Sequence, residues 1–341
     1  MPKTINVDAG FTQKVVITMN KVLLEVENLK TYFPVKEGIL KKTTGYVHAV
    51  DDISFKVYEQ ETFALVGESG CGKSTTGRSL LRIIEPTAGK VTFDGVDVQK
   101  LSKEEMRKKR KDMQLIFQNP YSSLNPRMTV KKLLIEPLKT HFNMYQEEME
   151  KQVLWVMDKV GLASDQLDRF PHQFSGGQRQ RISIARAIIS KPSFVVADEP
   201  VSALDVSIQS QILNLLMELQ KDLKLTYIFI SHDLNVVRHI SNSVAVMYLG
   251  RIVETGVTEQ IYENPMHPYT KALLSAVPSK DPLNKKKRIT LKGDVPSPVN
   301  PPKGCPLNSR CESAMSICKE IRPELMDMGD NHQVACHLYK G

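Results

Sequence analysis

A glycine-rich segment carries the residue types that bind phosphate, with the spacing Gly67-x-x-x-x-Gly72-Lys73-Ser74. Glycines let successive backbone N–H groups turn inward around the β- and γ-phosphates of a nucleotide, and the N-terminus of a following helix adds positive potential. Lys73 is expected to hold these phosphates and the Ser74 hydroxyl to ligate Mg²⁺. A strand signal, Thr62–Val66, precedes the segment and an apolar-periodic stretch follows it, which is the context a phosphate loop requires. The predicted loop comprises Gly67, Glu68, Ser69, Gly70, Cys71, Gly72, Lys73, Ser74 and Thr75.

A second chemical feature is a pair of carboxylates that follows a continuous apolar run. The run Phe194–Ala197 has the composition of a strand buried on both faces. Asp198 and Glu199 come directly after it. One carboxylate at such a strand end can reach Mg²⁺, and the next can polarise a water molecule for in-line attack.

A third feature is the segment Ser175-Gly176-Gly177-Gln178, which opens a predicted helix. A serine and two glycines at a helix N-terminus form an anion site. This segment cannot reach the ligand held by Lys73 without a large fold-back of the chain. A second copy of the protein, or a relative, could supply it across an interface.

Together these features resemble the nucleotide-binding subunits of ABC transporters over roughly residues 21 to 256. The resemblance rests on an ordered set of motifs: the phosphate loop, Gln118, Phe174-Ser-Gly-Gly-Gln178, Asp198-Glu199, Ser202-Ala-Leu-Asp205 and His232. In that family two cassettes pair head to tail. Each ATP is held by the phosphate loop of one subunit and the signature serine of the other, so Ser175, Gly176, Gly177 and Gln178 are expected to face the ATP of a partner.

The resemblance also implies roles for single residues. Glu199 would be the general base, His232 would contact the γ-phosphate, and Asp205 would communicate between the two sites. An aromatic side chain before the second strand would stack on adenine. Phe33 is the first choice, with Tyr32 and Tyr46 as alternatives. Mg²⁺ is assigned to Ser74, Gln118 and Asp198, and Gln118 would also sense the γ-phosphate and couple to the membrane subunits.

Three further segments narrow the resemblance to the oligopeptide/dipeptide importer ATPases, closest to their second, "F"-type, ATPase. They are Phe117–Arg127, Glu199–Ile208 and His267-Pro-Tyr-Thr-Lys-Ala-Leu-Leu274. The resemblance implies a heterodimer with a second ATPase, two permeases and an external peptide-binding protein, with this chain peripheral on the cytoplasmic face of the membrane. Import of another small solute, such as nickel, is an alternative.

Four of the five cysteines lie near the C-terminus: Cys305, Cys311, Cys318 and Cys336. The intervening gaps of five, six and seventeen residues lack the paired C-x-x-C spacing of a zinc site. Four thiolates in a short, core-poor segment nevertheless suit a metal centre. The resemblance implies a 4Fe–4S cluster. Zinc held with His332 or His337, and free thiols, are the alternatives.

Composition bounds the other function classes. The chain has 341 residues, a formal net charge of +8 and five cysteines, an odd number that argues against a closed disulfide framework. No apolar run reaches the length of a membrane span, and no secretory signal is evident. The positive surplus is spread over residues 1–50, 101–112 and 281–341, so no nucleic-acid partner is expected. A soluble ABC ATPase acting on nucleic acid or ribosomes, and a redox-sensing module built on the cysteines, are the competing hypotheses. Lys285-Lys-Lys-Arg288 is interpreted as a solvated linker rather than a lipid or nucleic-acid patch.

The order of predicted elements indicates an α/β fold with a largely parallel sheet. By resemblance this is a P-loop NTPase of the ABC type, with a RecA-like core, an antiparallel β edge and a helical subdomain at about 119–190. The predicted organisation is an N-terminal extension (1–20), the ATPase domain (21–256) and a small, irregular, cysteine-rich C-terminal module (257–341). Pro34, Gly38 and Gly45 predict loops after the first strand. The mostly helical stretch from Val130 to about Val160 is expected to break at Pro137.

Overall fold

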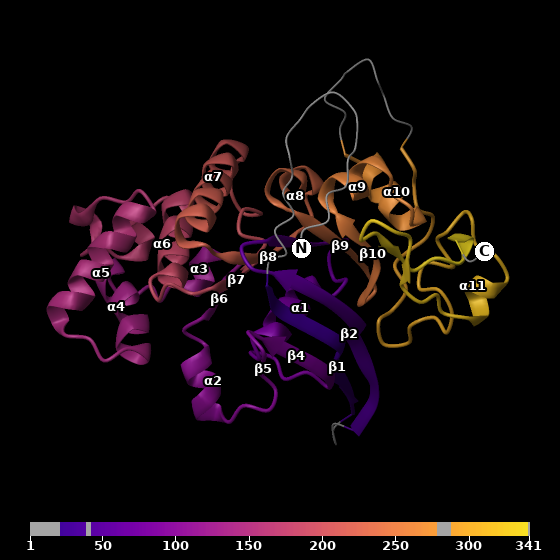
Figure 1. Ribbon diagram of the computed structural model, residues 1–341, viewed down its shortest axis with the longest axis horizontal. Coiled ribbons are helices and arrows are strands. Elements are labelled where there is room, and N and C mark those ends of the chain that lie inside the picture. The colour runs from indigo at the N-terminus through magenta and orange to yellow at the C-terminus, as the bar shows by residue number, and fades with distance from the viewer. Residues whose placement is uncertain (1–20, 39–41, 278–287, 340–341) are drawn as a thin grey trace, which may run out of the picture.

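The computed structural model describes residues 21–38, 42–277 and 288–339, in which two β-sheets are flanked by helices (Figure 1). The N-terminal extension and the lysines of the predicted basic linker lie outside these residues. The larger sheet has the order β11-β12-β10-β9-β3-β8-β7-β6, and its strands from β9 to β6 are parallel. The predicted α/β class is confirmed. The strands are β3 (Thr62–Val66), β6 (Met113–Ile116), β7 (Phe194–Asp198), β8 (Thr226–Ser231), β9 (Ser243–Tyr248), β10 (Arg251–Val257), β11 (Met326–Asp327) and β12 (Gln333–Val334).

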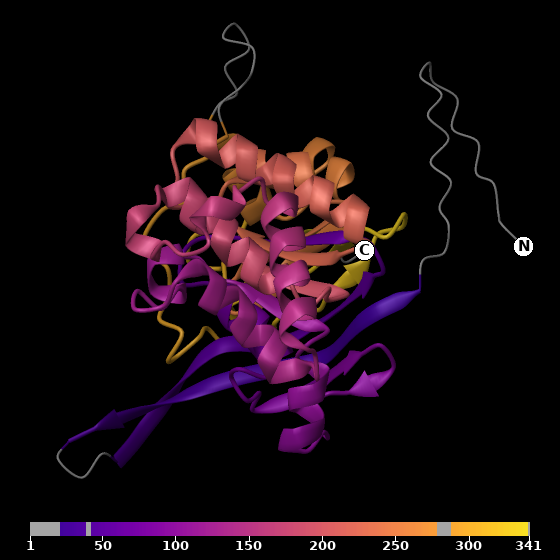
Figure 2. The same ribbon diagram turned by 90° about the vertical axis from the view of Figure 1, so that its left-hand side faces the viewer.

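The smaller sheet is antiparallel and is dominated by a long hairpin, which projects from the molecule in Figure 2. Its strands are β1 (Val22–Glu37), β2 (Lys42–Tyr58), β4 (Ala88–Phe93) and β5 (Val96–Asp97), in the order β2-β1-β4-β5. The predicted loops at Pro34 and Gly45 are therefore wrong, because both residues lie within strands and only Gly38 falls just outside one. Pairing of β1 with β4 ends at Lys30, so Pro34 pairs with β2 on one side only and lies in an edge part of the sheet, where proline is tolerated.

The helices follow the strands along the chain, and α3 to α6 gather at the end of the molecule opposite the C-terminal coil (Figure 1). They are α1 (Lys73–Leu80), α2 (Lys103–Lys109), α3 (Pro120–Ser123), α4 (Val130–His141), α5 (Gln146–Lys159), α6 (Gly176–Ile188), α7 (Val206–Leu223), α8 (Leu234–Ile240), α9 (Thr258–Glu263), α10 (Pro268–Ser275) and α11 (Ile317–Glu320). In the described parts of the chain, none of these helices has the length and hydrophobicity needed to cross a membrane.

Pro137 does not end a helix, although the sequence predicted a break in the helical stretch there. It lies inside α4, which continues to His141 before the turn that leads to α5. Leu134 and Leu138 on either side of it are fully buried. Burial of such side chains contributes about 1.5–3 kcal/mol each, which offsets the cost of the proline in the helix.

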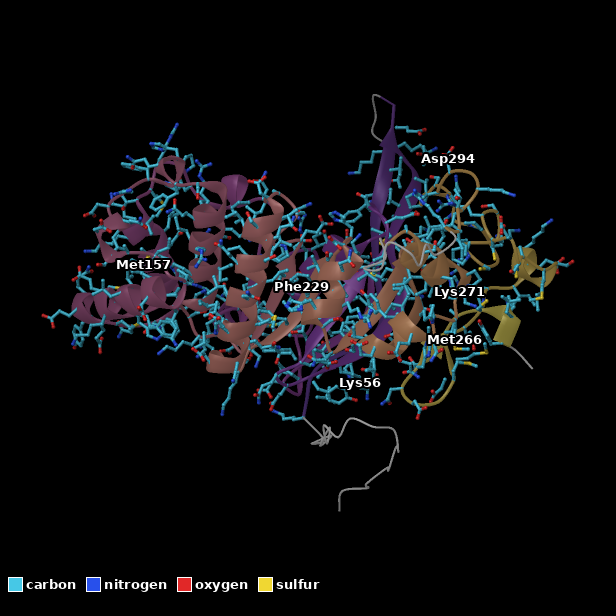
Figure 3. All side chains as sticks on the ribbon, turned by 90° about the horizontal axis from the view of Figure 1, so that it is seen from above. Lys56, Met157, Phe229, Met266, Lys271 and Asp294 are labelled. Carbon is cyan, nitrogen blue, oxygen red and sulfur yellow. The ribbon has the colours of Figure 1, made fainter. Side chains whose placement is uncertain are left out.

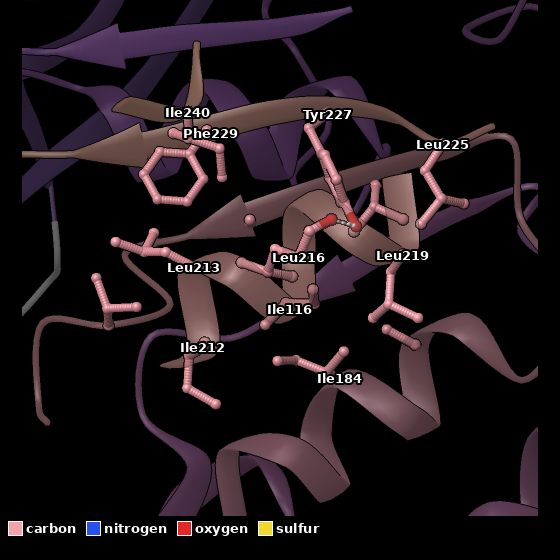
Figure 4. Packing of buried hydrophobic residues seen from close by; sticks show 14 of the residues in the cluster. Ile116, Ile184, Ile212, Leu213, Leu216, Leu219, Leu225, Tyr227, Phe229 and Ile240 are labelled. Carbon is pink, nitrogen blue, oxygen red and sulfur yellow. Dashed lines mark hydrogen bonds between the residues drawn. The ribbon is translucent and has the colours of Figure 1, made fainter. Parts of the chain in front are cut away.

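One of two hydrophobic clusters among the described residues lies between the larger sheet and the helices α6 and α7 (Figure 4), and the other includes residues of both sheets and of α1. All five residues of β7 are buried, as the continuous apolar run predicted. Tyr227 of β8 places its ring among the leucines of α7 and donates its hydroxyl to the backbone oxygen of Leu216 at 3.3 Å. This packing holds β8 against α7, and the predicted site residues begin at the opposite, carboxyl ends of the parallel strands.

Residues 258–277 and 288–339, called here the C-terminal segment, extend the larger sheet. Its strand β12 pairs with β10, with Val334 opposite Glu254. The fully buried Glu254 carboxylate accepts hydrogen bonds from the backbone N–H groups of Met266 (2.7 Å) and His267 (3.0 Å), and lies 2.7 Å from Nε2 of His332. Met266 and Lys271 lie beside the C-terminal coil in Figure 3. The sheet therefore continues across the predicted boundary after residue 256.

Candidate functional site

The phosphate loop connects β3 to α1, as its sequence context predicted. The buried Lys73 ammonium folds over the loop and donates to the backbone oxygens of Gly67 at 2.8 Å and Glu68 at 2.9 Å. Cys71 is buried beside it, with its Sγ 3.7 Å from the lysine Nζ, and burial raises the pKa of the thiol. The Lys73 side chain thus bridges the start and the end of the phosphate loop.

Two of the loop glycines are required by close backbone contacts. Gly67 has φ +150°, and a Cβ at this position would lie 2.2 Å from the backbone oxygen of Met247. Gly72 has φ +104°, and its Cβ would lie 2.0 Å from the backbone oxygen of Ala49. The adjacent strands therefore leave no room for any other residue at the two ends of the loop.

Asp198 ends β7 next to the start of α1. Its Oδ1 accepts a hydrogen bond from the Ser74 hydroxyl at 2.6 Å, and its Oδ2 lies 3.4 Å from an Arg78 guanidinium nitrogen. Only 1% of Asp198 is exposed. Serine and carboxylate oxygens are the hard ligands that Mg²⁺ takes in nucleotide sites, so the donor set fits this ion.

Glu199 has left-handed backbone geometry, with φ +46°, an uncommon conformation for a residue other than glycine. Its carboxylate is held by two partners that follow neighbouring strands: Gln118 Nε2 donates at 2.9 Å, and His232 Nδ1 lies 3.2 Å away. Its backbone N–H donates to Ile230 of β8 at 3.0 Å. The structure thus brings Gln118, Glu199 and His232 together at the carboxyl ends of parallel strands, as expected for a ligand site in such a sheet.

The signature segment forms a separate site. Ser175 is the N-cap of α6 and makes a capping box, in which its hydroxyl accepts from Gln178 N at 3.3 Å and its own N–H donates to Gln178 Oε1 at 3.0 Å. A Cβ on Gly177 would lie 2.6 Å from a methyl group of Ile208 in α7, the helix that Asp205 caps. Figure 1 shows α6 well apart from α1. The sequence-based expectation that this segment serves another chain is compatible with this separation.

Of the three aromatic candidates for adenine stacking, Tyr32 is committed elsewhere. Its ring stacks on His48 at 4.1 Å and its hydroxyl donates to Asp51 at 2.5 Å. Phe33 and Tyr46 are 37% and 51% exposed. Both lie on the hairpin whose strand β2 contacts the phosphate loop. Phe33 stays the residue predicted to stack on adenine.

Three of the four C-terminal cysteines have raised thiol pKa values, chiefly because of burial. Burial, followed by smaller effects that include the other thiols, raises the pKa of Cys305 to about 11 and shifts those of Cys311 and Cys336 upward. The backbone N–H of Cys305 donates to the oxygen of Cys318 at 2.8 Å. The chain therefore folds these distant residues into one neighbourhood.

This neighbourhood does not have the geometry of a metal site. Within the described residues, no group of three or more His, Cys, Asp or Glu side chains is arranged to hold an ion. The two histidines proposed as zinc ligands have other partners: His332 lies against Glu254, and Nε2 of His337 lies 2.9 Å from the Ile321 backbone oxygen. The predicted 4Fe–4S cluster is not supported by this arrangement.

A contact that the sequence did not predict joins the C-terminal segment to the phosphate loop. The N–H of Glu68 donates to the hydroxyl of Tyr269 at 2.9 Å. The Glu68 carboxylate accepts from Arg310 at 3.1 and 3.5 Å. Tyr269 belongs to the His-Pro-Tyr motif, so this motif was the one signal in the sequence, whereas nothing singled out Arg310.

Comparisons with known proteins agree with this geometry. The profile of the family described as "ABC transporter" matches residues 50–202, and that of "Oligopeptide/dipeptide transporter, C-terminal region" matches residues 253–318. The oligopeptide transport ATP-binding protein AppF of Bacillus subtilis is 52% identical, with 94% of this chain and 98% of AppF covered. The chain belongs to the ABC transporter family, among the oligopeptide and dipeptide transport ATP-binding proteins. The dipeptide transport ATP-binding protein DppF of Haemophilus influenzae is also 52% identical, covering 93% of this chain and 97% of its own length.

Solved structures confirm the cassette fold of this ABC ATPase. The ADP- and phosphate-bound dimer of the ATP-binding cassette MJ0796 matches with a TM-score of 0.62 at 28% identity, covering 69% of this chain and 98% of MJ0796. The ABC protein cbiO1 of Clostridium perfringens matches with a TM-score of 0.61 at 27% identity, covering 71% and 91%. These matches support the predicted P-loop NTPase fold, and the family match and the curated relatives support the predicted ATPase activity.

Proposed function

We propose that this ABC ATPase hydrolyses ATP to power the import of oligopeptides or dipeptides across a membrane. The observation that carries the proposal is the Glu199 carboxylate, held by Gln118 and His232 beside the Ser74–Asp198 pair. The peptide substrate is inferred from relatives that match nearly the whole chain and are named for oligopeptide and dipeptide transport.

Each group of site residues has a different role in ATP hydrolysis. The loop N–H groups and Lys73 bind the β- and γ-phosphates. Ser74, Asp198 and Gln118 would hold Mg²⁺, which would offset the charge that develops on these phosphates. Glu199 orients the attacking water and accepts its proton, because its carboxylate lies at the strand ends that face the loop. His232 contacts the γ-phosphate.

A second ATPase completes each site. The signature serine Ser175 lies on α6, away from the phosphate loop of its own chain. We therefore infer a head-to-tail pair in which Ser175 and Asp205 face the partner's ATP. The likeness to a cassette solved as a dimer with ADP and phosphate supports this arrangement.

Permease subunits would dock in a groove of about 750 Å³ between the sheet and the α3–α6 helices. Its lining includes Gln114 and Phe117 of the segment that leads to Gln118, together with Glu136 of α4 and Arg186 of α6. A partner bound here would move Gln118 relative to Glu199. We place the protein peripherally on the cytoplasmic face of the membrane, with an external peptide-binding protein delivering the substrate.

The test is peptide uptake and ATP hydrolysis by the assembled transporter carrying Glu199→Gln. We expect hydrolysis at the site of this chain to fall about 10²- to 10⁴-fold with ATP binding retained, because only the base is lost. Glu259→Gln, which alters an exposed ion pair with Arg238, is the matched control. Undiminished uptake with the corresponding base of the partner ATPase also removed would contradict the mechanism. Uptake of nickel instead of peptide, or co-purification with RNA or DNA instead of permeases, would favour the alternative functions.

A 4Fe–4S cluster or zinc at the four cysteines stays a prediction, supported only by their convergence in a cysteine-rich C-terminal module. Metal analysis and a visible spectrum of anaerobically purified protein test it. Less than one zinc or four irons per chain, with all five thiols titratable in the denatured protein, would contradict it.

A further inference from the structure

Two side chains of the C-terminal segment form hydrogen bonds with Glu68, the second residue of the phosphate loop. Tyr269 accepts a hydrogen bond from the Glu68 backbone N–H, and Arg310 donates to both of its carboxylate oxygens. These contacts link residues 201 and 242 positions apart in sequence.

The His-Pro-Tyr turn is built to present Tyr269. Burial, helped by Lys271, lowers the pKa of His267 to about 3, so its imidazole is neutral. Its Nδ1 accepts a hydrogen bond from the backbone N–H of Tyr269 at 3.1 Å and caps α10. The Tyr269 side chain is fully buried, with its ring tilted against that of Tyr248 at 4.7 Å. The hydroxyl is therefore held at a fixed point over the loop.

Arg310 is held with similar rigidity by the cysteine-bearing part of the segment. Only 9% of it is exposed, and its guanidinium also lies over the Tyr248 ring, with Nη1 3.4 Å from the Tyr248 hydroxyl. Its backbone N–H donates to Leu307 at 2.9 Å, within the turn that begins at Cys305. Among the residues that the structure describes, the carboxylate paired with this buried arginine is that of Glu68.

The position of Glu68 matters for ATP in two ways. Its backbone oxygen accepts one of the hydrogen bonds of Lys73, so a shift of Glu68 displaces the lysine that holds the phosphates. Its carboxylate belongs to a loop that must bind a polyanion, and an unpaired negative charge there would repel the nucleotide. Arg310 compensates this charge and draws it toward the C-terminal segment.

We propose that Tyr269 and Arg310 are positioning residues of the ATP site, which set the affinity of the phosphate loop for ATP by holding Glu68. The C-terminal segment thereby contributes positioning residues to the nucleotide site of its own subunit. The ATP affinity of this chain depends on the integrity of the cysteine-bearing turn that carries Arg310.

The test compares Arg310→Met, Glu68→Gln and the double variant in the full chain, with ATP binding measured by calorimetry and hydrolysis measured in the assembled transporter. Arg310→Met is expected to raise Kd and KM for ATP about tenfold, since it removes a charge-assisted hydrogen bond, while kcat stays within about threefold. Glu68→Gln removes the repelling charge and is expected to bind ATP normally. The double variant should recover most of the lost affinity. Tyr269→Phe, which removes a neutral hydrogen bond, should raise KM about fivefold.

The rescue distinguishes positioning from a merely structural role. Arg238→Met, which removes an exposed arginine of α8 from its pair with Glu259, is the control and should leave Kd unchanged. Unaltered ATP affinity in Arg310→Met, or a double variant that binds as weakly as Arg310→Met, would overturn the proposal. Should Arg310→Met not fold, Arg310→Gln with and without Glu68→Gln makes the same comparison, because glutamine also removes the positive charge that pairs with Glu68 while keeping a polar side chain.

Discussion

Two glycines of the phosphate loop provide a sharp test of the loop geometry, because they differ in what surrounds them. A Cβ added at Gly72 would lie 2.0 Å from the backbone oxygen of Ala49 and 3.6 Å from Cα of Gly250. A Cβ added at Gly70, which also has positive φ (+81°), would meet no atom within 4 Å. Gly70→Ala therefore reports backbone strain alone, whereas Gly72→Ala adds a steric clash.

The magnitude follows from how firmly the neighbours are held. Cβ contacts under 3.0 Å are essentially never seen, so Gly72→Ala forces a shift of roughly 1 Å. The shift strains the hydrogen bonds from Gly250 N to Cys71 O (3.0 Å) and from Asp51 N to Gly250 O (2.8 Å). Backbone strain, overpacking and a weakened hydrogen bond together cost about 3–6 kcal/mol. Gly70→Ala should cost about 1–2 kcal/mol.

The assay is urea unfolding of the full chain without nucleotide, so that any contact of the new methyl group with ATP does not enter. We expect the free energy of unfolding of Gly72→Ala to lie at least about 2 kcal/mol below that of Gly70→Ala. Equal losses in the two variants, or a Gly72→Ala variant as stable as wild type, would refute the close contact with Ala49.

Three further outcomes are expected. Burial lowers the pKa of His267 to about 3 from 6.5, so as the pH falls below about 6.5 the unfolded chain binds a proton that the folded chain does not. Wild type should therefore lose about 2 kcal/mol of unfolding free energy between pH 7 and 5. In urea titrations over the same pH range, His267→Asn should lose much less. Burial raises the pKa of Cys305 to about 11 from 9.0, so in metal-free protein at pH 8 its alkylation, followed by mass spectrometry, should be about a hundredfold slower than that of an ordinary thiol. His332→Ala leaves the buried Glu254 one partner short and should cost about 1–3 kcal/mol, whereas an unchanged denaturation midpoint would exclude this role for the pair.

The sequence predicted the elements whose signals are local. The continuous apolar run before Asp198 predicted a fully buried strand, and β7 is buried throughout. The phosphate loop was predicted from its glycine spacing and from the strand and helix around it. The Asp94-Gly95 pair, with φ of +49° and +75°, forms the turn of the β4–β5 hairpin and is a local signal of the same kind.

The sequence misled where distant partners decide the outcome. Pro34 and Gly45 lie in a paired hairpin because antiparallel pairing over many residues outweighs their weak strand preference. Pro137 stays inside α4 because tertiary burial of the flanking leucines outweighs the helix-breaking tendency of proline. Neither pairing nor burial is visible in a window of a few residues.

By itself, then, the sequence determined the α/β class, the phosphate loop, the two acidic residues and the separate signature segment, since each depends on residue type and short spacing. Only the tertiary structure decided that Gln118 and His232 hold the Glu199 carboxylate, and that Arg310 and Tyr269 hold Glu68. The physical reason is that hydrogen bonds and ion pairs depend on distances of a few ångströms, which strand order and packing set between residues up to 242 positions apart.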